Sequence, residues 1–379
     1  MNHVALVIPG LDRIGGAERQ VILIAEGLAR RGWRVSVVAL SGTGGDTAET
    51  LTAAGVHFLS LHMRKGLADP QGWIHFRRWL QQEKPDVVHA HLPHAASFAR
   101  WSRLCTPMRV LIDTLHSSST GSIGRHLGYR VSNWLPDTVT AVSHNVADAH
   151  LAAGMVASNK VVVVPNGVDV EAFRPDREAR AAIRRELGLE KEFLWVAAGR
   201  LEAVKDYPTL LRAMAEVPEP ARLVIAGAGP LESDLRRLSK DLGQEPRVRF
   251  LGFEPDVLPW MQAADGFVLS SRWEGLPMGL LEAAACALPA VATDVPGTRE
   301  VIIPWQTASL AVPANARSLQ GAMTRMMRLP PEEHNIMGQR ARQRVVEQFS
   351  LAAVLDRWEA LYIRLLDRNP APRRWGASG

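Results

Sequence analysis

The sequence predicts an α/β protein built from two doubly wound parallel sheets. Three observations support this fold class. Short apolar runs of strand length alternate with longer amphipathic segments, glycine-rich turns follow several of the runs, and the alternation begins again after residue 170. Strands that alternate with helices pair in parallel through crossover connections. A chain of 379 residues is also long enough for two domains of ordinary size.

The first series of elements occupies residues 1–170. Strands are expected where apolar runs end at turn residues, at Val4–Pro9, Arg34–Leu40, Asp86–His91, Val110–Leu115, Thr138–Val142 and Lys160–Val164. A helix is expected over Ala17–Arg31, because apolar residues lie on one helical face at positions 21, 24, 25 and 28 and Gly32 closes the segment. These elements predict a first domain at residues 1–170.

The second series of elements follows a turn-rich segment at residues 165–175, which contains Pro165, Gly167 and Pro175. We interpret this segment as the connection between the domains. Further strands are expected at Phe193–Ala198, Arg222–Ala226, Gly266–Leu269 and Ala290–Thr293, with helical segments between them. These elements predict a second domain at residues 171–350.

The composition excludes several classes of protein. With 47% hydrophobic and 22% charged residues, the chain is neither disordered nor fibrous. Cys105 and Cys286 are too few for a disulfide framework or a four-ligand zinc site. The start of the sequence has no basic region before a long apolar run, and no stretch reaches about 18 apolar residues. We therefore expect a cytoplasmic protein without a secretory signal or a membrane span.

The charge is unevenly distributed along the chain. Residues 1–170 carry 16 basic against 12 acidic residues and 11 of the 12 histidines, whereas residues 171–379 carry 28 basic against 27 acidic residues. Two interpretations stay open. The first half meets an anionic partner such as a phosphate or a membrane surface, or its composition has drifted without functional meaning. No nucleic acid partner is expected.

The most specific pattern is the segment from Glu274 to Glu282, directly after the strand at Gly266–Leu269. Ligands of open α/β sheets bind beyond the carboxyl ends of the strands, here by default in a cleft between the two domains. Pro277 is expected in the first turn of a helix, so the N–H groups from Leu276 to Gly279 would face an anion or sugar hydroxyls. The alternative is a capped helix with two glutamates on the surface.

Two further loops are expected at the same edges of the sheets. Arg200 and Lys205 follow the first strand of the second domain, where a guanidinium and an ammonium group would bind a diphosphate. Gly15 and Gly16 follow the first strand of the chain and would let a ligand approach the backbone. Their loop does not match G-x-G-x-x-G, so no dinucleotide site is predicted. The alternative for the cations is an ordinary solvated loop.

Histidines also lie at strand ends in the first domain. His116 follows the strand at Val110–Leu115, where it would donate to a sugar hydroxyl or serve a structural role. His89 and His91 alternate along a strand, so both side chains point to the same face, with His94 close behind. We predict no metal site and no cofactor, because no further ligands complete this set and no Asp-x-Asp sequence occurs in the chain.

Taken together, these motifs resemble those of the retaining glycosyltransferases of family 4, which have the GT-B fold of two facing Rossmann-like domains. The resemblance covers nearly the whole chain. It rests on the sequences Gly15-Gly-Ala-Glu-Arg19, Val164-Pro-Asn-Gly-Val-Asp169, Gly199-Arg-Leu-x3-Lys205 and Ser270-Ser-Arg-Trp-Glu-Gly-Leu-Pro through Glu282. In the last motif the family usually has Phe-Gly where this chain has Leu276-Pro277. Phe349-Ser350 and the helix Leu351–Asp367 resemble the terminal helix that crosses back to the first domain, so residues 351–379 are assigned there.

The resemblance implies a role for each matching residue. The catalytic set would be His116, Arg200, Lys205 and Glu274. The donor-binding set would be Gly15, Gly16, Arg200, Lys205, Gly275, Leu276, Pro277, Met278 and Glu282. Arg200, Lys205 and the Gly16 N–H would bind the diphosphate. Glu274 would hold donor-sugar hydroxyls, Glu282 the ribose, and His116 the donor sugar near its reacting carbon.

The implied function is retaining, metal-independent transfer of a sugar from a UDP- or GDP-linked donor to a hydroxyl acceptor, a glycan or a lipid-linked intermediate in cell-surface polysaccharide assembly. A nucleotide-sugar epimerase and a non-catalytic nucleotide-sugar-binding protein are the alternatives.

A membrane-facing surface is also expected in the first domain. Basic residues accompany tryptophans in segment 62–79, namely Arg64, Lys65, Arg77 and Arg78 with Trp73 and Trp79. Such a mixture is typical of proteins that rest on the inner face of an anionic membrane. Residues 125–134, with Arg125, Arg130 and Trp134, are the second candidate. The alternative for segment 62–79 is an amphipathic helix packed on its own domain.

Overall fold

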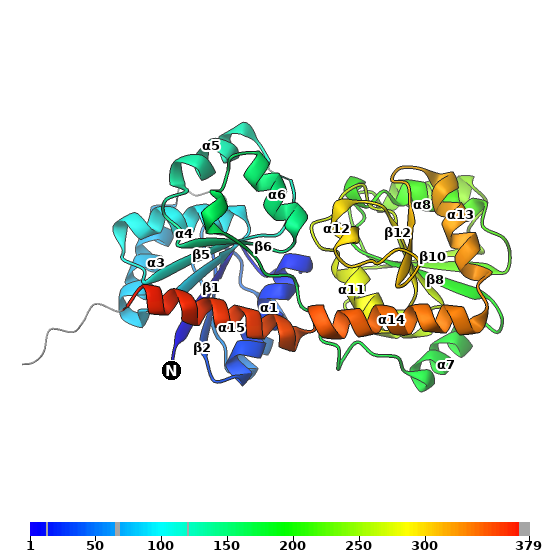
Figure 1. The fold of residues 1–379 in the computed structure, drawn as a ribbon, viewed down its shortest axis with the longest axis horizontal. Helices are drawn as coiled ribbons and strands as arrows, with labels where there is room; N and C mark the ends of the chain where they lie inside the picture. The colour runs from blue at the N-terminus through cyan, green and yellow to red at the C-terminus, as the bar shows by residue number, and fades with distance from the viewer. Residues whose placement is uncertain (13, 65–68, 120, 371–379) are drawn as a thin grey trace, which may run out of the picture. The chain divides into compact units, whose positions relative to one another are not determined.

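The computed structural model describes residues 1–12, 14–64, 69–119 and 121–370. The chain divides into two compact units. The first comprises Met1–Gly167 together with the chain from Leu351, and the second comprises Val168–Ser350. The division lies close to the predicted boundary at residue 170, and the helix from Leu351 belongs to the first unit (Figure 1).

The first unit contains a parallel sheet of seven strands in the order β3-β2-β1-β4-β5-β6-β7. The strands are β1 (His3–Ile8), β2 (Arg34–Ala39), β3 (His57–Ser60), β4 (Val87–His91), β5 (Val110–Leu115), β6 (Thr138–Ala141) and β7 (Val161–Val163). The helices are α1 (Gly16–Arg30), α2 (Gly45–Ala53), α3 (Pro70–Glu83), α4 (Pro93–Cys105), α5 (Ile123–Ser132), α6 (His144–Ala152) and α15 (Leu351–Arg368).

The core of the first unit lies on both faces of its central strands. Helices α1 and α15 pack side by side on one face, and α4 packs against β1, β4 and β5 from the other (Figure 1). Gly27 allows α1 and α15 to approach closely, because a Cβ atom there would lie 2.4 Å from Leu355 Cδ1. Trp358 and Tyr362 of α15 are fully buried in this core.

The second unit contains a parallel sheet of six strands in the order β10-β9-β8-β11-β12-β13. The strands are β8 (Phe193–Ala198), β9 (Ala221–Ala226), β10 (Val248–Gly252), β11 (Gly266–Leu269), β12 (Ala290–Thr293) and β13 (Ala308–Ala311). The helices are α7 (Arg177–Glu186), α8 (Tyr207–Ala215), α9 (Glu232–Asp241), α10 (Leu258–Ala263), α11 (Met278–Ala285), α12 (Pro296–Arg299), α13 (Ala316–Met327) and α14 (Pro331–Phe349), with a 3₁₀ turn at Ala203–Lys205.

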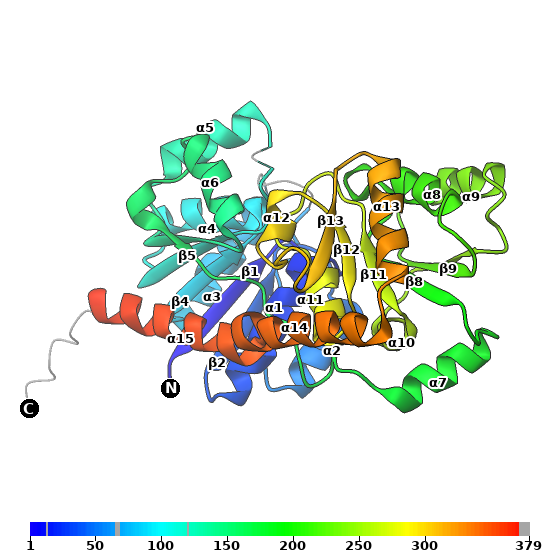
Figure 2. The ribbon, with the colours of Figure 1, turned by 45° about the vertical axis from the view of Figure 1, so that its right-hand side comes forward.

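Helices cover both faces of this second sheet as well. Figure 2 shows α8, α9 and α13 on one side of the strands, where their apolar residues form one core with β8, β9, β11 and β12. Helices α10 and α11 pack on the other face. Both units are therefore parallel α/β layers, and the predicted fold class is confirmed.

Three strands that the sequence analysis did not predict are β3, β10 and β13. Each of them lies at an edge of its sheet. Their sequences HFLS, VRFLG and ASLA contain polar or charged residues and so lack the continuous apolar run that identifies a buried parallel strand, whereas β7, also an edge strand, has such a run and was predicted. The prediction therefore recovered the interior of each sheet better than its borders.

Candidate active site

The loops that follow β8 and β11 bring two predicted residues into contact. Lys205 lies at the end of the 3₁₀ turn after β8, and Glu274 lies between β11 and α11. Lys205 Nζ donates to Glu274 Oε1 over 2.6 Å. Both groups are at the carboxyl ends of neighbouring strands, where the sequence placed them. Their sequence motifs imply separate roles for the two residues and did not predict this ion pair.

Glu274 is held by more than its ion pair. Ser271 Oγ donates to the same Oε1 atom over 2.6 Å, and the residue is only 9% exposed. The backbone of the α12 segment approaches closely, since a Cβ atom on Gly297 would lie 2.4 Å from the Glu274 carbonyl oxygen. These contacts fix the position of the carboxylate. Ser271 was not predicted as a site residue, although it belongs to the same Ser-Ser-Arg-Trp-Glu motif.

Glu282 lies inside α11 and is 5% exposed. Both glutamates of the motif are thus buried, so the alternative of two surface glutamates is wrong. The helix begins at Met278, and Pro277 occupies the N-cap position before it, not the first turn as predicted. Residues 274–277 are buried, whereas Met278 is half-buried at the helix start.

Arg200 has a different environment from Lys205. Its side chain is 69% exposed, and its ion-pair partner is Glu202 at 3.1 Å. Within the part of the chain that the structure describes, no hydrogen bond or ion pair joins Arg200 to Lys205 or Glu274. Lys205 instead extends over Gly199, whose added Cβ atom would lie 3.5 Å from Lys205 Cε. Lys205 is therefore a fixed cation and Arg200 an exposed one.

The glycine loop of the first unit forms the N-terminus of α1. Gly15 is the N-cap residue and Gly16 is the first residue of the helix. The Gly15 N–H donates to Glu18 Oε2 over 3.0 Å, so the side chain of the third helical residue caps the N-terminus of the helix. The side chain of Glu18 therefore occupies the N–H of Gly15, while Gly16, whose N–H was expected to bind the diphosphate, is exposed.

His116 follows β5 and contacts a second histidine at the end of β4. His91 Nδ1 and His116 Nε2 are 3.1 Å apart. His91 and His89 point to the same face of the strand, as predicted, and their ring centroids are 4.0 Å apart. Burial lowers the pKa of His116 to about 4 and holds the pKa of His91 well below its usual value of 6.5.

His89 continues this buried polar group toward α15. Its Nδ1 atom lies 2.7 Å from the Tyr362 hydroxyl, and its Nε2 atom lies 2.5 Å from Thr114 Oγ1. Both ring nitrogens therefore have protein partners, and His94 is exposed on α4. Over the described ranges, no three His, Cys, Asp or Glu residues are arranged to hold a metal ion.

The loop after β8 and the loop after β4 each contain a residue with positive φ. Asp206, which follows Lys205, has a φ of 48°, and Leu92, which follows His91, has a φ of 71°. Positive φ is unfavourable for these residues by about 1–3 kcal/mol and persists where the surrounding structure enforces it. Asp206 is held by Thr209 Oγ1 at 2.9 Å and by Arg272 Nε at 3.2 Å. Among the described residues, these are two of seven non-glycine residues with positive φ, so the strain alone does not mark the site.

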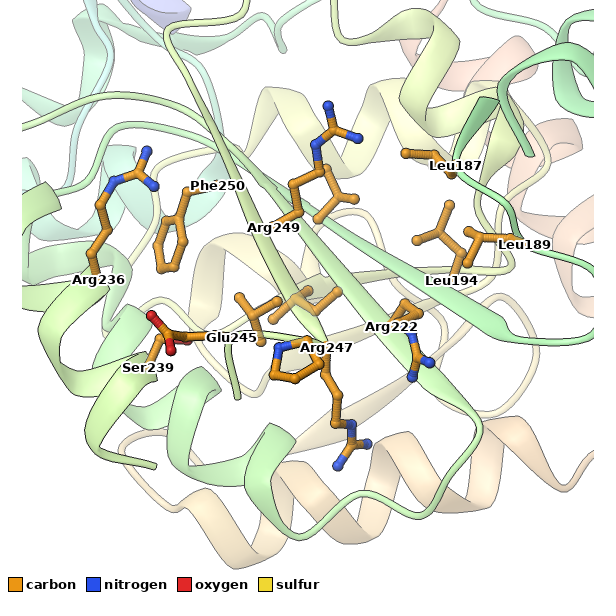
Figure 3. A pocket seen from close by; sticks show the side chains of 14 residues that line it. Leu187, Leu189, Leu194, Arg222, Arg236, Ser239, Glu245, Arg247, Arg249 and Phe250 are labelled. Atoms are coloured by element: carbon orange, nitrogen blue, oxygen red, sulfur yellow. The ribbon is translucent and has the colours of Figure 1, made fainter. Parts of the chain in front are cut away.

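A hollow of about 570 Å³ lies elsewhere on the second unit, beside the edge strand β10 (Figure 3). The residues that line this hollow from the sheet belong mainly to the first halves of β8, β9 and β10. The hollow therefore does not lie at the carboxyl ends of the strands. The side chains of Arg247 and Arg249 point in opposite directions in Figure 3 and do not converge on one ligand group. We therefore do not assign this hollow to the candidate site.

The predicted basic surface at residues 62–79 differs from expectation. Trp79 is 6% exposed, and Trp73 packs on Phe98 with ring centroids 4.5 Å apart. Both tryptophans of this segment thus contact their own unit, as in the alternative of a packed amphipathic helix. Arg64, Arg77 and Arg78 are exposed, and Lys65 lies outside the described residues.

Large apolar side chains are exposed on α5 instead. Ile123, Leu127 and Val131 recur at every fourth position and are 87%, 64% and 56% exposed, and Trp134 is 67% exposed. Within the described part of the chain, none of the helices combines the length and the apolar character that crossing a bilayer requires.

Two family models match this chain. The model described as Glycosyltransferase Family 4 matches residues 14–172, and the model described as Glycosyl transferases group 1 matches residues 179–344. Together the two matches include most of both units.

Curated relatives and solved structures are similar over most of their length. The UDP-Gal:alpha-D-GlcNAc-diphosphoundecaprenol alpha-1,3-galactosyltransferase of Escherichia coli is 26% identical over 314 residues, 79% of this chain and 81% of the relative. The N-acetyl-alpha-D-glucosaminyl L-malate synthase of Bacillus anthracis is 28% identical over 304 residues, 76% of this chain and 78% of the relative. The crystal structure of Anabaena HepE in complex with UDP-glucose has a TM-score of 0.83 and 21% identity, covering 94% of this chain and 99% of HepE.

Proposed function

The chain belongs to the family 4 glycosyltransferases, and from that premise we propose that it transfers a sugar, with retention, from a UDP- or GDP-linked donor to a hydroxyl of a glycan or lipid-linked acceptor. The observation that carries this proposal is the fixed ion pair of Lys205 and Glu274 at the carboxyl ends of β8 and β11. It places a cation and a hydrogen-bond acceptor side by side at the ligand-binding edge of a parallel sheet.

Lys205 and Arg200 would act on the leaving group. As the bond between the sugar carbon and the diphosphate breaks, negative charge develops on the diphosphate, and fixed cations stabilise that charge. Lys205 is positioned before any ligand arrives because Glu274 and the packing over Gly199 hold it. Arg200 is exposed and can reorient toward the diphosphate. Glu274 would accept hydrogen bonds from donor-sugar hydroxyls.

Retention is proposed to proceed without a protein nucleophile. Glu274 Oε1 already accepts from Lys205 and Ser271, an arrangement that favours a positioning role over attack on the sugar. The acceptor hydroxyl would attack from the same face that the diphosphate leaves. Its oxygen bonds to the sugar carbon, the carbon–phosphate-oxygen bond breaks, and the acceptor proton passes to the departing phosphate oxygen.

The activity test is a screen of UDP- and GDP-linked sugars, first for slow hydrolysis and then for transfer to glycan and lipid-linked acceptors. NMR of the product would give the anomeric configuration, and we expect it to match that of the donor. An inverted product would contradict the mechanism. Conversion of the donor into a different sugar nucleotide, with no sugar transferred to any acceptor, would identify an epimerase.

Metal independence is proposed because protein cations can take the place of a bridging ion at the diphosphate. The assay is repeated after exhaustive chelation. We expect the rate to be maintained. Complete loss of transfer that magnesium or manganese restores would contradict this part of the proposal.

We also propose that the enzyme rests on an anionic membrane, on the inner face of the cell membrane, through α5. The apolar residues of an amphipathic helix ordinarily face the core, but Ile123, Leu127 and Val131 face solvent on α5, and Tyr129 is buried instead. No acidic residue occurs between Thr114 and Pro136, so the patch is suited to anionic headgroups. The E. coli relative, named for a diphosphoundecaprenol acceptor, supports a lipid-linked substrate.

Vesicle co-sedimentation tests this surface. The α5 variant replaces Ile123, Leu127, Val131 and Trp134 with Ser, and the matched α3 variant replaces Arg64, Arg77 and Arg78 with Ser. We expect the α5 variant to lose at least about tenfold in binding to anionic vesicles, because burial of each such side chain contributes about 1.5–3 kcal/mol. The α3 variant should lose binding mainly at low salt. Failure of the wild-type protein to bind anionic vesicles would contradict the membrane proposal. A larger loss of vesicle binding in the α3 variant than in the α5 variant would place the surface on α3.

A further inference from the structure

The contact between His91 and His116 joins the ends of two neighbouring strands. His91 is the last residue of β4 and pairs in register with Thr114 of β5, so His116 lies just beyond the same edge of the sheet. The 3.1 Å separation of His91 Nδ1 and His116 Nε2 is a hydrogen-bond distance. One of these nitrogens must carry the proton and the other must accept it.

The burial of His91 decides which nitrogen donates. His91 has no exposed surface, and its Nε2 atom has no hydrogen-bond partner in the residues the structure describes. A proton on that Nε2 would be a buried N–H without an acceptor, which native proteins rarely contain. The proton of neutral His91 is therefore on Nδ1, and His116 Nε2 is the acceptor.

We propose that His91 is a positioning residue that donates from Nδ1 to His116 Nε2 and so fixes His116 as the tautomer with its proton on Nδ1. His116 would then present an N–H donor, and not a basic lone pair, to an oxygen atom of the bound donor sugar. This inference rests on the proposed function for the identity of that ligand. The tautomer itself does not depend on it.

The surroundings of His91 keep the pair rigid and uncharged. The His89 ring lies against His91 and is tied at both nitrogens to Tyr362 and Thr114, so the His91 ring has little room to rotate. Burial lowers the pKa of His116 to about 4, and the nearby imidazoles oppose protonation of His91 further. A neutral pair with one proton between the two nitrogens is thus maintained at pH 7.

The direct test is ¹⁵N NMR of the full chain labelled at histidine, which distinguishes the two neutral tautomers through long-range couplings to ring protons. The His116 signals are identified by their absence in His116→Asn. We expect wild-type His116 to be protonated at Nδ1 without any ligand. Protonation of His116 at Nε2 in the wild type would overturn the proposal, whatever the activity of the variants.

Two variants test the role of His91 in catalysis. In His91→Asn the amide nitrogen lies near the position of Nδ1 and can still donate, whereas His91→Leu removes the donor. We expect His91→Leu to mix the His116 tautomers and to lower kcat by about 10- to 100-fold, as loss of an orienting partner does, with little change in donor KM. His91→Asn should recover both readouts, and His75→Asn, at an exposed histidine on α3, should change neither.

The outcomes distinguish the role of His91 from the contact of His116 with the donor sugar. Equal tautomer populations in the wild type and His91→Leu would overturn the positioning role. A tautomer change without any change in kcat would support the positioning role and would instead contradict the proposed contact of His116 with the donor sugar.

Discussion

Lys205 and Glu274 are 69 residues apart in the sequence, yet the side chains of Lys205 and Ser271 both donate to Glu274 Oε1. The ion pair is partly buried, with side chains 22% and 11% exposed. At that burial, the loss of one partner leaves the other charge poorly solvated. A variant of either residue therefore alters both the cation that we propose for the diphosphate and the carboxylate that we propose for the donor sugar.

Lys205→Ala should lower kcat by about 10²- to 10³-fold, the usual effect of removing one fixed donor from a developing negative charge. Glu274→Gln should also reduce the rate, and the double variant should lose less than the product of the two single effects, because the residues act as one unit. Steady-state transfer rates give this cycle. Strictly multiplicative losses would contradict the coupling of the two residues.

A matched control for the cation is Arg236→Ala, since Arg236 is a helix-surface cation paired with Glu232. It should retain the wild-type rate. Arg200→Ala should lose activity as Lys205→Ala does, although Arg200 lies exposed in the unliganded chain. Near wild-type rates in both Lys205→Ala and Arg200→Ala would refute the assignment of these cations to the diphosphate.

The buried histidines predict how stability depends on pH. Burial, with a smaller effect of nearby His116, lowers the pKa of His89 to about 3. Between pH 6.5 and that value the unfolded chain binds a proton at this residue and the folded chain does not. The free energy of unfolding therefore falls as the pH decreases below 6.5, by about 1.4 kcal/mol per pH unit for each such histidine. His89→Gln should make this slope shallower by about that amount.

Urea denaturation between pH 7 and pH 5 measures the slope. Thr114→Val is the control, because it removes the hydrogen bond to His89 Nε2 while keeping the histidine. It should lower stability at every pH and leave the slope unchanged. Equal slopes in the wild type and His89→Gln would show that His89 is protonated in the folded protein.

At the scale of an element, α5 is attached to its unit through a buried polar cluster. Arg100 and Asp113 have no exposed surface and form an ion pair at 2.5 Å. Arg100 also donates to Ser132 Oγ over 3.0 Å and lies over the Tyr129 ring at 4.3 Å. Tyr129 and Ser132 are the buried residues of α5. This cluster holds the inner face of the helix, which leaves its apolar residues on the outside.

Arg100→Met and Asp113→Asn should each lower the free energy of unfolding by about 3–5 kcal/mol, because each leaves an uncompensated buried group. The double variant Arg100→Met/Asp113→Asn should be less destabilised than the sum of the two single variants, since it leaves no buried charge. Arg34→Met, which breaks the exposed pair with Glu83, should cost no more than about 1 kcal/mol. Equal small losses at both pairs would mean that the cluster does not anchor α5.

At the scale of the whole molecule, the first unit is completed by the end of the chain. Helix α15 buries a row of large side chains in the core beneath α1, at Leu351, Val354, Leu355, Trp358, Leu361, Tyr362, Leu365 and Leu366. Each contributes about 1.5–3 kcal/mol when fully buried. Their sum, about 12–24 kcal/mol, reaches or exceeds the 5–15 kcal/mol by which a domain is ordinarily stable.

A chain that ends at Ser350 should therefore keep a folded second unit and lose the fold of the first. Amide hydrogen exchange measures this directly. We expect protection to persist in β8, β9 and β11 and to disappear in β1, β4 and β5. In the full chain, Ile363→Ser/Arg364→Ser on the exposed face of α15 should leave both units protected. Protected amides in β1 of the shortened chain would contradict the dependence on α15.

The sequence by itself determined the class of fold and the positions of the site motifs. Central parallel strands are buried on both faces, so they read as continuous apolar runs, and nine of the ten predicted strands lie in sheet interiors. The motifs follow such strands directly, which places Lys205, Glu274 and His116 at the carboxyl edges without knowledge of any contact. The edge strands β3, β10 and β13 lack that pattern and were missed.

Only the tertiary structure decided which side chains meet and which face inward. The contacts of Lys205 with Glu274 and of His91 with His116 join residues that are 69 and 25 positions apart, and local periodicity carries no information about them. The same reason explains the surface of the first unit. A helical pattern identifies an apolar stripe but not its direction, and the buried pair of Arg100 and Asp113 turns the stripe of α5 to solvent, while packing against Phe98 turns Trp73 of α3 inward.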